Sequence, residues 1–527
     1  MAELSIEEFR ALAEADKSYA LLDIREPGEY SAGHIPNSTS LPRRDIEFRI
    51  GDLVPLRETP IIVAGETDLR ASRAARTIET IGYERVLQLK EGFPGWAQAG
   101  HPVATGVNVP SKRFGEETHS KCGVPEIDPE ELYVRMMRGE PIRVLDARTP
   151  EEYGRFCIPG GVNVPGGDLV LWAGDLKKEP DTRIVINCAG RTRSIIGTET
   201  LRLLGLDNVS ALKNGTMGWV LSGLELEQRP NRATAGPSEV GRRFAEEQAE
   251  RIARSECLPS LPVSDLRRLM DQRRRRTVYL TDVRSSEEYV SGHIPGFQCV
   301  PGGQAIQRAD DYVAVRQSTI VFACDRSARA VMAAYWYRAT GFSDVYFLRG
   351  GVEAWRESGL EIETGEPAKP IAGLERARAA ARFITARKLT TQLSGRNPPV
   401  VLDVGASREY GRGHIPGALW LSRGWLEEKF PRAVSDREQR VVVTCPRGDH
   451  STLAGATLRE IGYAHVSVLE GGTAAWTQAG LAPEPGLTRM LSEPNDVVLS
   501  ASVTGDREAM RRYLEWEIEL GRKHEKS

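Results

Sequence analysis

Three cysteines occupy one repeated position in this chain, and their residue type could do chemistry at each copy. Cys188, Cys324 and Cys445 each follow an Asp by 42 residues, and a fourth unit of the chain has Gly65 at the same offset. The thiolate of cysteine is a strong nucleophile. The spacing therefore predicts covalent thiol chemistry in three units and none in the fourth.

Fixed offsets from that Asp establish the repeat. A Trp follows each Asp by 73 residues, and a His or Cys in an Ile-Pro motif follows it by 11. Successive units are 123, 136 and 121 residues apart, so length changes fall between units, as expected for four independently packed domains. The four sets, in chain order, are Asp23, His34 and Trp96; Asp146, Cys157 and Trp219; Asp282, His293 and Trp355; Asp403, His414 and Trp476.

The elements that must position the cysteines follow from the local patterns. Each unit has a helix N-cap candidate, then a short apolar strand ending in the Asp, a second apolar strand ending at the cysteine position, and an Ala-rich helical pattern. Strands that alternate with helices predict an α/β fold of four tandem domains, each a small doubly wound parallel sheet flanked by helices. The cap candidates are Ser5, Asp128, Ser264 and Thr385.

The domains are placed at 1–105, 122–230, 258–365 and 380–485, and are called domains 1 to 4. Three linkers separate them: a Gly/Pro/Lys-rich stretch near 105–124, a charged stretch near 230–260 with helical spacing over 238–254, and residues 364–382, which end in an Arg/Ala helical run. The tail, 486–527, ends in a predicted helix near 506–523. Its apolar positions favour packing onto a domain over binding a partner.

The loops after the three cysteines have the composition of an anion cradle. Each cysteine ends a strand and precedes a tight loop that opens a helix, where backbone N–H groups and the helix dipole favour negative charge. Arginines in the loops add positive charge. We therefore expect a lowered thiol pKa and a site for a small anion. The alternative is that each cysteine is a small buried apolar residue.

Composition sets limits on partners and location. The 527 residues carry a net charge of −3, which favours neither nucleic acid nor a membrane as partner. The acidic, amphipathic start has no signal-peptide pattern, and no run of about 18 apolar residues occurs. Seven cysteines, an odd and sparse count, favour reduced thiols in a cytoplasmic protein. No metal-ligand spacing is present, and no cofactor is implied.

The motifs together resemble the rhodanese family of sulfurtransferases. They are Gly-His-Ile-Pro-Gly (292–296 and 413–417, with Asn37 ending the variant at 33–37), a preceding Asp-x-Arg with Glu-Tyr, the cysteine loop, and a final Gly-Gly-x-x-Ala-Trp. The resemblance covers nearly the whole chain except the linkers and the tail. It implies four tandem rhodanese domains.

The resemblance also implies a reaction. A thiolate attacks the outer sulfur of a donor such as thiosulfate, sulfite leaves, and the cysteine persulfide passes its sulfur to cyanide or a thiol. The leading nucleophile would be Cys188, with Cys324 and Cys445 as further ones. The arginines expected to bind the anionic donor are Arg148, Arg191, Arg193, Arg284, Arg326, Arg329 and Arg447. The alternative is a persulfide carrier or scaffold that relays sulfur between partner proteins, with an acceptor protein as partner.

A phosphatase of the related fold is the rival enzyme class. That chemistry needs Cys, five residues, then Arg, and the required positions hold Ser194, Ala330 and Ser451. The shorter loop favours a sulfur atom over a phosphate group. An aryl phosphate turned over as fast as thiosulfate would reverse this interpretation.

The four domains are expected to differ. Domain 1 has no nucleophile, and domain 2 has the most complete basic loop, although Cys157 replaces the motif His. In domain 3, Asp325 beside the cysteine opposes thiolate formation. In domain 4, Gly405 replaces the Asp-x-Arg arginine, and His450 should make the loop less positive as pH rises through the His range. Many two-domain members of the rhodanese family pair an inactive unit with an active one, so the resemblance implies that domain 1 pairs with domain 2, and that domains 3 and 4 form a second pair.

Cys157 has two interpretations. It is more simply a small buried residue than a relay or resolving thiol. The His that it replaces is expected to be structural.

Overall fold

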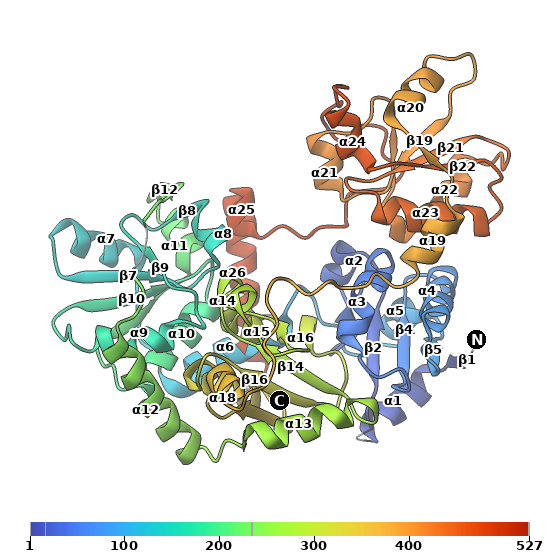
Figure 1. Ribbon diagram of the computed structural model, residues 1–527. Coiled ribbons are helices and arrows are strands. Elements are labelled where there is room, and N and C mark those ends of the chain that lie inside the picture. The colour runs from blue at the N-terminus through green and yellow to red at the C-terminus, as the bar shows by residue number, and fades with distance from the viewer. Residues whose placement is uncertain (1, 16, 233–234, 525–527) are drawn as a thin grey trace. The chain divides into compact units, whose positions relative to one another are not determined.

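The computed structural model describes residues 2–15, 17–232 and 235–524. Within them each domain has one five-stranded parallel sheet with helices on its faces (Figure 1). The predicted fold class is confirmed. No helix of the described chain is both long and apolar enough to cross a lipid bilayer.

Domain 1 illustrates how the sequence forms the sheet. Strands β2 and β4 consist of apolar runs whose residues are all buried, as expected for central strands covered on both faces. The strand order is β1-β5-β4-β2-β3. Its strands are β1 (Ala2–Leu4), β2 (Ala20–Asp23), β3 (Thr39–Ser40), β4 (Ile61–Ala64) and β5 (Val86–Leu89), and its helices are α1 (Ile6–Glu14), α2 (Pro27–Ala32), α3 (Ile46–Leu53), α4 (Asp68–Ile81) and α5 (Gly92–Gln98), with a 3-10 turn η1 (Arg43–Asp45).

Domain 2 has the same strand order, β6-β11-β10-β7-β9, and adds a short antiparallel pair, β8 with β12. Its strands are β6 (Glu126–Ile127), β7 (Ile142–Asp146), β8 (Phe156–Cys157), β9 (Val162–Asn163), β10 (Arg183–Asn187), β11 (Val209–Leu212) and β12 (Glu227–Gln228). Its helices are α7 (Pro129–Met137), α8 (Pro150–Tyr153), α9 (Leu169–Leu176), α10 (Thr192–Leu203) and α11 (Gly215–Leu221).

Domains 3 and 4 repeat the order as β13-β17-β16-β14-β15 and β18-β22-β21-β19-β20. Domain 3 contains β13 (Ser260–Leu261), β14 (Val278–Asp282), β15 (Gln298–Cys299), β16 (Thr319–Ala323), β17 (Val345–Leu348), α13 (Val263–Asp271), η2 (Gln272–Arg274), α14 (Ser286–Ser291), α15 (Gly302–Gln307), α16 (Ala309–Tyr312), α17 (Ala328–Ala339) and α18 (Gly351–Glu357). Domain 4 contains β18 (Phe383–Ile384), β19 (Val400–Asp403), β20 (Leu419–Trp420), β21 (Val441–Thr444), β22 (Val466–Leu469), α20 (Ala386–Leu393), α21 (Ser407–Arg412), η3 (Arg423–Trp425), α22 (Leu426–Ala433), α23 (Asp449–Glu460) and α24 (Gly472–Gln478).

The segments between domains are largely helical. The charged stretch before domain 3 forms α12 (Glu239–Ser255), and α19 (Leu374–Ala380) precedes domain 4. The Gly/Pro/Lys-rich linker, for which no helix was predicted, forms α6 (Val109–Cys122). The tail contains α25 (Ala501–Thr504) and the predicted C-terminal helix, α26 (Arg507–His524), whose Met510 and Leu514 pack against Met217 of domain 2.

Three of the four predicted cap residues stand at the N-cap of a helix, and two of them form the side-chain bond expected of a cap. Ser5 and Thr385 each accept a hydrogen bond from a first-turn amide. Asp128 stands at the N-cap of α7 without a side-chain cap bond and pairs with Lys213. Ser264 was wrongly assigned, because α13 begins at Val263 after Pro262. In domain 3 the Asp lies 21 positions after the end of the first strand (282−261), where in the others it lies 19 positions after it (23−4, 146−127, 403−384), so its helix starts two residues farther from the Asp.

The domains associate in an order that the sequence analysis did not predict. The chain forms two compact units, one with domains 1 and 4 and the other with domains 2 and 3. In the first unit, Arg43 pairs with Glu427 at 3.0 Å, and Glu26 accepts a hydrogen bond from the Ser422 hydroxyl at 2.7 Å. The predicted pairing of domain 1 with 2 and of 3 with 4 is therefore wrong.

One repeated position explains the choice of partners. The residues 20 and 21 after the Asp are Gly166 and Gly167 in domain 2 and Gly302 and Gly303 in domain 3. These glycines let two backbones touch, since a Cβ on Gly167 would lie 2.8 Å from the Gly302 Cα. Domains 1 and 4 have Arg43-Arg44 and Arg423-Gly424 there, and these arginines contribute to a buried ion-pair network.

Candidate functional site

The last motif of each domain supports the carbonyl of the cysteine position. The second glycine of the motif has a φ of +54 to +64°, and a Cβ there would overlap that carbonyl oxygen in all four domains. The next residue donates its N–H to the same oxygen at 2.8–3.0 Å, as Thr473 does to Cys445. Glycine is therefore required for close backbone approach and left-handed φ. The glycines are Gly92, Gly215, Gly351 and Gly472.

The histidines of the Ile-Pro motif hold loops together. Each is buried, stacks on the Tyr four residues earlier with 3.7–3.8 Å between ring centroids, and places Nδ1 within 3.0 Å of that Tyr carbonyl oxygen. This agrees with the expected structural role. The residues are His34, His293 and His414.

Cys157 takes the place of that His in domain 2. It is fully buried, and an Arg232 guanidinium nitrogen lies 3.2 Å from its Sγ. Burial, with the charge of Glu227, raises the pKa of the thiol to about 11. A thiol held in this protonated form fits the interpretation as a small buried residue.

The arginine of each Asp-x-Arg motif binds the Asp at the end of the central strand and a backbone carbonyl of a nearby loop. In domain 2, Arg148 binds both carboxylate oxygens of Asp146 through Nε and Nη2, and Nη2 also donates to the Phe156 carbonyl. Arg284 in domain 3 and Arg25 in domain 1 repeat this arrangement. The geometry commits these guanidinium groups to their own domains, and a part in substrate binding for Arg148 and Arg284 stays a prediction.

The site in domain 1 is closed as well as lacking a thiol. A Cβ on Gly65 would lie 3.1 Å from the Ala71 Cβ and 3.3 Å from Ile24 Cδ1. The only arginine in the loop, Arg70, pairs with Glu29 at 2.9 Å. No described group at this position can act as a nucleophile.

In domain 2, carboxylates neutralise both loop arginines. Arg191 pairs with Glu116 of α6 at 2.6 Å and with Glu126 at 3.1 Å, and Arg193 pairs with Glu152 at 2.6 Å. Cys188 is 2% exposed, and its Sγ lies 3.4 Å from the Ser194 hydroxyl. The loop that looked most basic in sequence therefore offers no unpaired arginine to an anion.

The C-terminal helix covers the same loop. Glu517 of α26 accepts hydrogen bonds from the Thr192 hydroxyl at 2.6 Å and from the Thr192 amide at 3.3 Å, at the start of α10. Glu517 is 1% exposed, and a Cβ on Gly190 would lie 3.1 Å from its second oxygen. A carboxylate of the chain itself thus lies at the helix N-terminus, where an anionic donor was expected.

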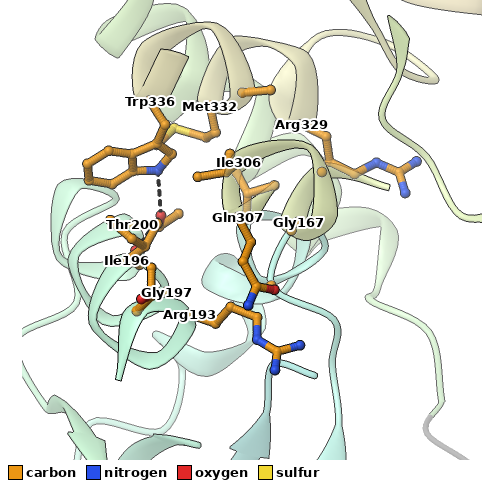
Figure 2. Close-up of a pocket in the computed structure, with 16 residues that line it drawn as sticks. Gly167, Arg193, Ile196, Gly197, Thr200, Ile306, Gln307, Arg329, Met332 and Trp336 are labelled. Atoms are coloured by element: carbon orange, nitrogen blue, oxygen red, sulfur yellow. Dashed lines mark hydrogen bonds between the residues drawn. The ribbon is translucent and has the colours of Figure 1, made fainter. Parts of the chain in front are cut away.

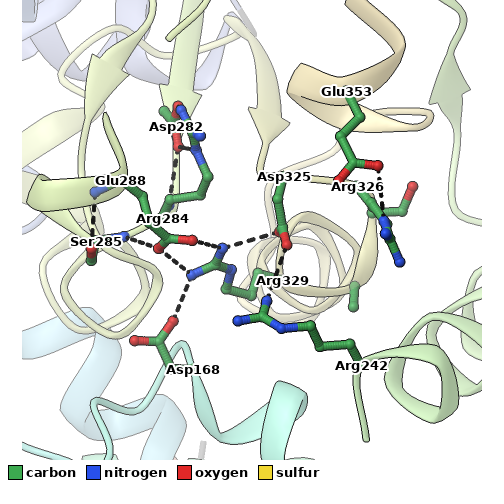
Figure 3. Close-up of polar contacts among 12 residues, drawn as sticks. Asp168, Arg242, Asp282, Arg284, Ser285, Glu288, Asp325, Arg326, Arg329 and Glu353 are labelled. Atoms are coloured by element: carbon green, nitrogen blue, oxygen red, sulfur yellow. Dashed lines mark hydrogen bonds and ion pairs between the residues drawn. The ribbon is translucent and has the colours of Figure 1, made fainter. Parts of the chain in front are cut away.

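Domain 3 has a similar arrangement (Figure 3). The Arg329 guanidinium contacts Glu288, Asp168 and Asp325 within 3.0 Å, and Arg326 pairs with Glu353 at 2.9 Å. Glu246 of α12 accepts hydrogen bonds from two amides at the start of α17, Ser327 at 3.1 Å and Ala328 at 3.1 Å. A second linker helix therefore supplies a carboxylate to a second cysteine loop.

A small, mostly apolar cavity lies between α10 and α17 (Figure 2). The Trp336 indole donates to the Thr200 hydroxyl at 3.0 Å on one side. Arg193 and Arg329 line it, but their guanidinium groups extend away from it toward the carboxylates described above. The cavity belongs to the contact between domains 2 and 3 and contains no nucleophile.

Domain 4 has an amide cradle around the thiol itself. The Gly448 amide lies 3.2 Å from Cys445 Sγ, the Ser451 amide 3.3 Å and the Ser451 hydroxyl 3.4 Å. Gly448 has a φ of +104°, which turns its N–H toward the sulfur. Arg447 is exposed and forms no ion pair with any described residue. In domains 2 and 3 the residue at the position of Gly448 is Arg191 or Ser327, each with negative φ.

The resting thiols do not have the lowered pKa that the sequence suggested. Burial raises the pKa of Cys188, Cys324 and Cys445, and this effect exceeds that of the neighbouring donors and arginines. For Cys324 the Asp325 carboxylate adds to the increase, as expected. For Cys445 the opposing groups are Ser451 and the Gly448 amide. The prediction failed because it counted nearby charges and omitted desolvation.

The prediction for His450 is also wrong. Its ring stacks on Phe48 of domain 1 at 4.2 Å between centroids, and burial with the charges of Arg423 and Arg44 lowers its pKa to about 3. His450 therefore stays neutral through the physiological range and does not titrate the loop.

The signal that sequence reasoning missed was conformational. Gly448, three residues after Cys445, lets the loop turn an amide toward the thiol. The sequence interpretation compared only the number of loop arginines, which favoured domain 2. The assignment of Cys188, Cys324 and Cys445 as nucleophiles, and of the loop arginines as donor ligands, stays a prediction.

Comparison with known proteins gives one consistent result. The rhodanese-like domain family matches residues 5–99, 128–222, 263–358 and 385–479. A crystal structure of thiosulfate sulfurtransferase from Pseudomonas aeruginosa is similar over 99% of this chain and 97% of that chain, with 36% identity and a TM-score of 0.91.

Two curated relatives are similar over shorter stretches. A putative thiosulfate sulfurtransferase, SseB, of Mycobacterium tuberculosis is 25% identical over 241 residues, which are 37% of this chain and 84% of that protein. A putative sulfur carrier protein, YrkF, of Bacillus subtilis is 33% identical over 94 residues, which are 18% of this chain and half of that protein.

Proposed function

The chain belongs to the rhodanese family of sulfurtransferases and sulfur carriers, and on that premise we propose that it transfers sulfane sulfur from thiosulfate through a persulfide on Cys445. The observation that carries the choice of domain 4 is the Gly448 amide, which lies 3.2 Å from Cys445 Sγ and adds to the Ser451 amide at 3.3 Å. The amides that correspond to Ser451 also interact with Cys188 and Cys324, so Gly448 makes the difference. Such donors stabilise a thiolate and the negative charge of a persulfide.

The proposed reaction has two steps. The Cys445 thiolate attacks the outer sulfur of thiosulfate, a new S–S bond forms, and sulfite leaves with the electron pair of the bond that breaks. Cyanide or a thiolate then attacks the outer sulfur of the persulfide, and the Cys445 thiolate is restored as thiocyanate or a new persulfide departs. No external oxidant or reductant is needed. Arg447, exposed and unpaired among the described residues, would attract the anionic donor.

The other two cysteines are less suited to a free donor. Glu517 accepts a hydrogen bond from the Thr192 amide beside Cys188, and Glu246 accepts hydrogen bonds from the Ser327 and Ala328 amides beside Cys324. A carboxylate at these positions repels a dianion and blocks its hydrogen bonds. The ranking proposed from geometry is therefore Cys445 first, in place of Cys188.

Single Cys445→Ser, Cys188→Ser and Cys324→Ser variants test this proposal in the thiosulfate:cyanide reaction. We expect Cys445→Ser to lose at least about 100-fold in kcat, since the nucleophile is gone, and the other two to retain most activity. Intact-mass analysis after thiosulfate treatment should locate one added sulfur on the peptide containing Cys445. A loss confined to Cys188→Ser would refute the assignment.

The carrier alternative predicts a different result in the same assay. If the chain accepted persulfide sulfur from a donor protein but did not turn over thiosulfate, the result would favour the carrier function.

A further inference from the structure

Domain 4 retains two carboxylates whose arginine partners are missing. In the other three domains, Arg25, Arg148 and Arg284 bind the Asp that ends the central strand. Domain 4 has Gly405 at that position, so Asp403 has no guanidinium partner among the described residues. It keeps the bond from the amide two residues later, here Gly405 at 2.8 Å, which the other three domains also have, and the Thr473 side chain donates to it. Asp403 is 2% exposed.

A second ion pair is lost in the same domain. Glu29, Glu152 and Glu288 each pair with an arginine five residues after the cysteine position, at 2.6–2.9 Å. The residue at that position in domain 4 is His450, whose ring stacks on Phe48. Glu409, which corresponds to the three glutamates, is exposed and keeps a contact to the Ala406 amide at 3.3 Å.

The space left by these arginines is a pocket beside the nucleophile. A cavity of about 220 Å³ is lined by Asp403, Glu409, Tyr410, Gly413, Pro446 and Thr473. Pro446 follows Cys445, and Thr473 donates its amide to the Cys445 carbonyl. In domains 1 and 3 the carbonyl that corresponds to Gly413, that of Gly33 or Gly292, accepts a hydrogen bond from the guanidinium. The groups that hold the guanidinium elsewhere therefore line an open pocket here.

We propose that this pocket is a cation subsite of the Cys445 centre, which binds the guanidinium or ammonium group of a small thiol that accepts the sulfur. A buried carboxylate without a cationic partner is costly, and an organic cation offsets that cost with charge-assisted hydrogen bonds. Arg412 also lines the pocket, is exposed, and forms no ion pair with a described residue. Its positive charge opposes the binding of a cation and so limits the affinity of the subsite.

The acceptor assignment rests on the proposed function. The thiolate of the bound aminothiol attacks the outer sulfur of the Cys445 persulfide, and a new S–S bond forms. The bond between Cys445 Sγ and that sulfur breaks, and its electron pair returns to Sγ. The products are an aminothiol persulfide and the Cys445 thiolate, so atoms and electrons balance without an oxidant.

Binding of methylguanidine to the full chain, measured by calorimetry, tests the subsite without any sulfur transfer. The informative variant adds the missing arginine as Gly405→Arg. A Cβ on Gly405 would lie 2.8 Å from Pro446 Cδ, so the substitution is made with Pro446→Ala, which copies the Cys-Ala of domain 2. We expect methylguanidine to bind Pro446→Ala at least about 10-fold more tightly than the double variant, because the new guanidinium fills the pocket.

A second variant covers the case in which the double variant does not fold. Glu409→Gln should weaken methylguanidine binding about 3- to 5-fold, as expected for removal of one partly screened charge. Glu460→Gln, an equal charge change at an exposed position outside the pocket, should leave it unchanged. No binding to the natural chain, or equal binding to Glu409→Gln and Glu460→Gln, would overturn the subsite.

The acceptor assignment is tested by sulfur transfer from the persulfidated chain to cysteamine and to 2-mercaptoethanol. Because these thiols differ in thiolate fraction, the quantity compared between variants is the ratio of kcat/KM for cysteamine to kcat/KM for 2-mercaptoethanol. We expect this ratio to fall about 3- to 5-fold in Glu409→Gln and to stay constant in Glu460→Gln. An unchanged ratio in Glu409→Gln would overturn the assignment. If the chain formed no persulfide, the proposed function would fail, while the methylguanidine result would still decide the subsite.

Discussion

The loops after Cys188 and Cys445 begin from the same backbone and differ in what surrounds the thiol. In both, a glycine lets the chain approach the cysteine carbonyl, and a Ser hydroxyl lies 3.4 Å from Sγ. At Cys188 the loop arginines are paired and Glu517 occupies the helix start. The Ser194 amide interacts with Cys188 as the Ser451 amide does with Cys445, but at Cys445 the Gly448 amide also faces the sulfur, and the neighbouring carboxylates lack their arginines. A count of basic residues therefore ranks the two sites in the opposite order to their geometry.

Apart from removal of the nucleophile itself, the largest expected effect comes from the residue three positions after each cysteine. Gly448→Ala forces a side chain into a φ of +104° and displaces the amide that lies 3.2 Å from Cys445 Sγ. We expect kcat for thiosulfate:cyanide transfer to fall about 30- to 100-fold, the range for a strained backbone and one lost donor. The matched Arg191→Ala should change kcat less than about two-fold. A larger loss in Arg191→Ala would return the leading role to Cys188.

The next effect concerns the cover over Cys188. Glu517→Ala removes the carboxylate that holds α26 on Thr192, so Cys188 should react about 10-fold faster with iodoacetamide, as expected for a local opening made easier by roughly 1.4 kcal/mol. Peptide mapping after timed alkylation measures this rate. Glu515→Ala, an exposed position on the same helix, is the control. Equal rates in the two variants would show that α26 does not protect the thiol.

The smallest effect is a pH dependence confined to domain 4. Burial, with a contribution from Glu409, raises the pKa of Asp403 to about 7, so its ionised fraction grows from about one-tenth at pH 6 to about nine-tenths at pH 8. The other charged or titratable groups facing the pocket are Arg412 and Tyr410. Since a cation prefers the carboxylate, methylguanidine should bind about 5-fold more tightly at pH 8 than at pH 6. Calorimetry at both pH values measures this, and a constant or falling affinity contradicts it.

Most of the fold could be predicted from the sequence because the repeat is regular. Fixed offsets from Asp23, Asp146, Asp282 and Asp403 gave four domains, and alternating apolar runs and helical patterns gave a parallel sheet in each. The pairing of domains was predicted wrongly, although the Gly-Gly steps at 166–167 and 302–303 were visible. Their meaning depends on two backbones meeting, which a single repeat does not reveal.

The positions of the candidate site residues were easier to predict from the sequence than the charges that surround them. The cysteine positions and the losses at Gly405 and His450 were read directly. The partners of the arginines were not, because Glu116, Glu246 and Glu517 come from linker and tail helices far away in sequence. Gly405 was read from the sequence only as the loss of the Asp-x-Arg arginine, whereas the structure places a pocket there.

The pairing of domain 1 with domain 4 affects the order in which the chain can fold during synthesis. Domain 1 leaves the ribosome before domains 2 to 4, but the partners of its buried Glu26, Arg43 and Arg44 outside domain 1 exist only when residues 422–496 have been made. Domain 4 ends 380 residues after domain 1 (485−105), so at about 5–20 residues per second this interval is about 20–80 s. During it the residues of domains 2 and 3 are made, whereas α26, which packs on domain 2, follows only after domain 4. Domain 1 is thus made before the other three domains and yet completes its native contacts only after domain 4 has been made.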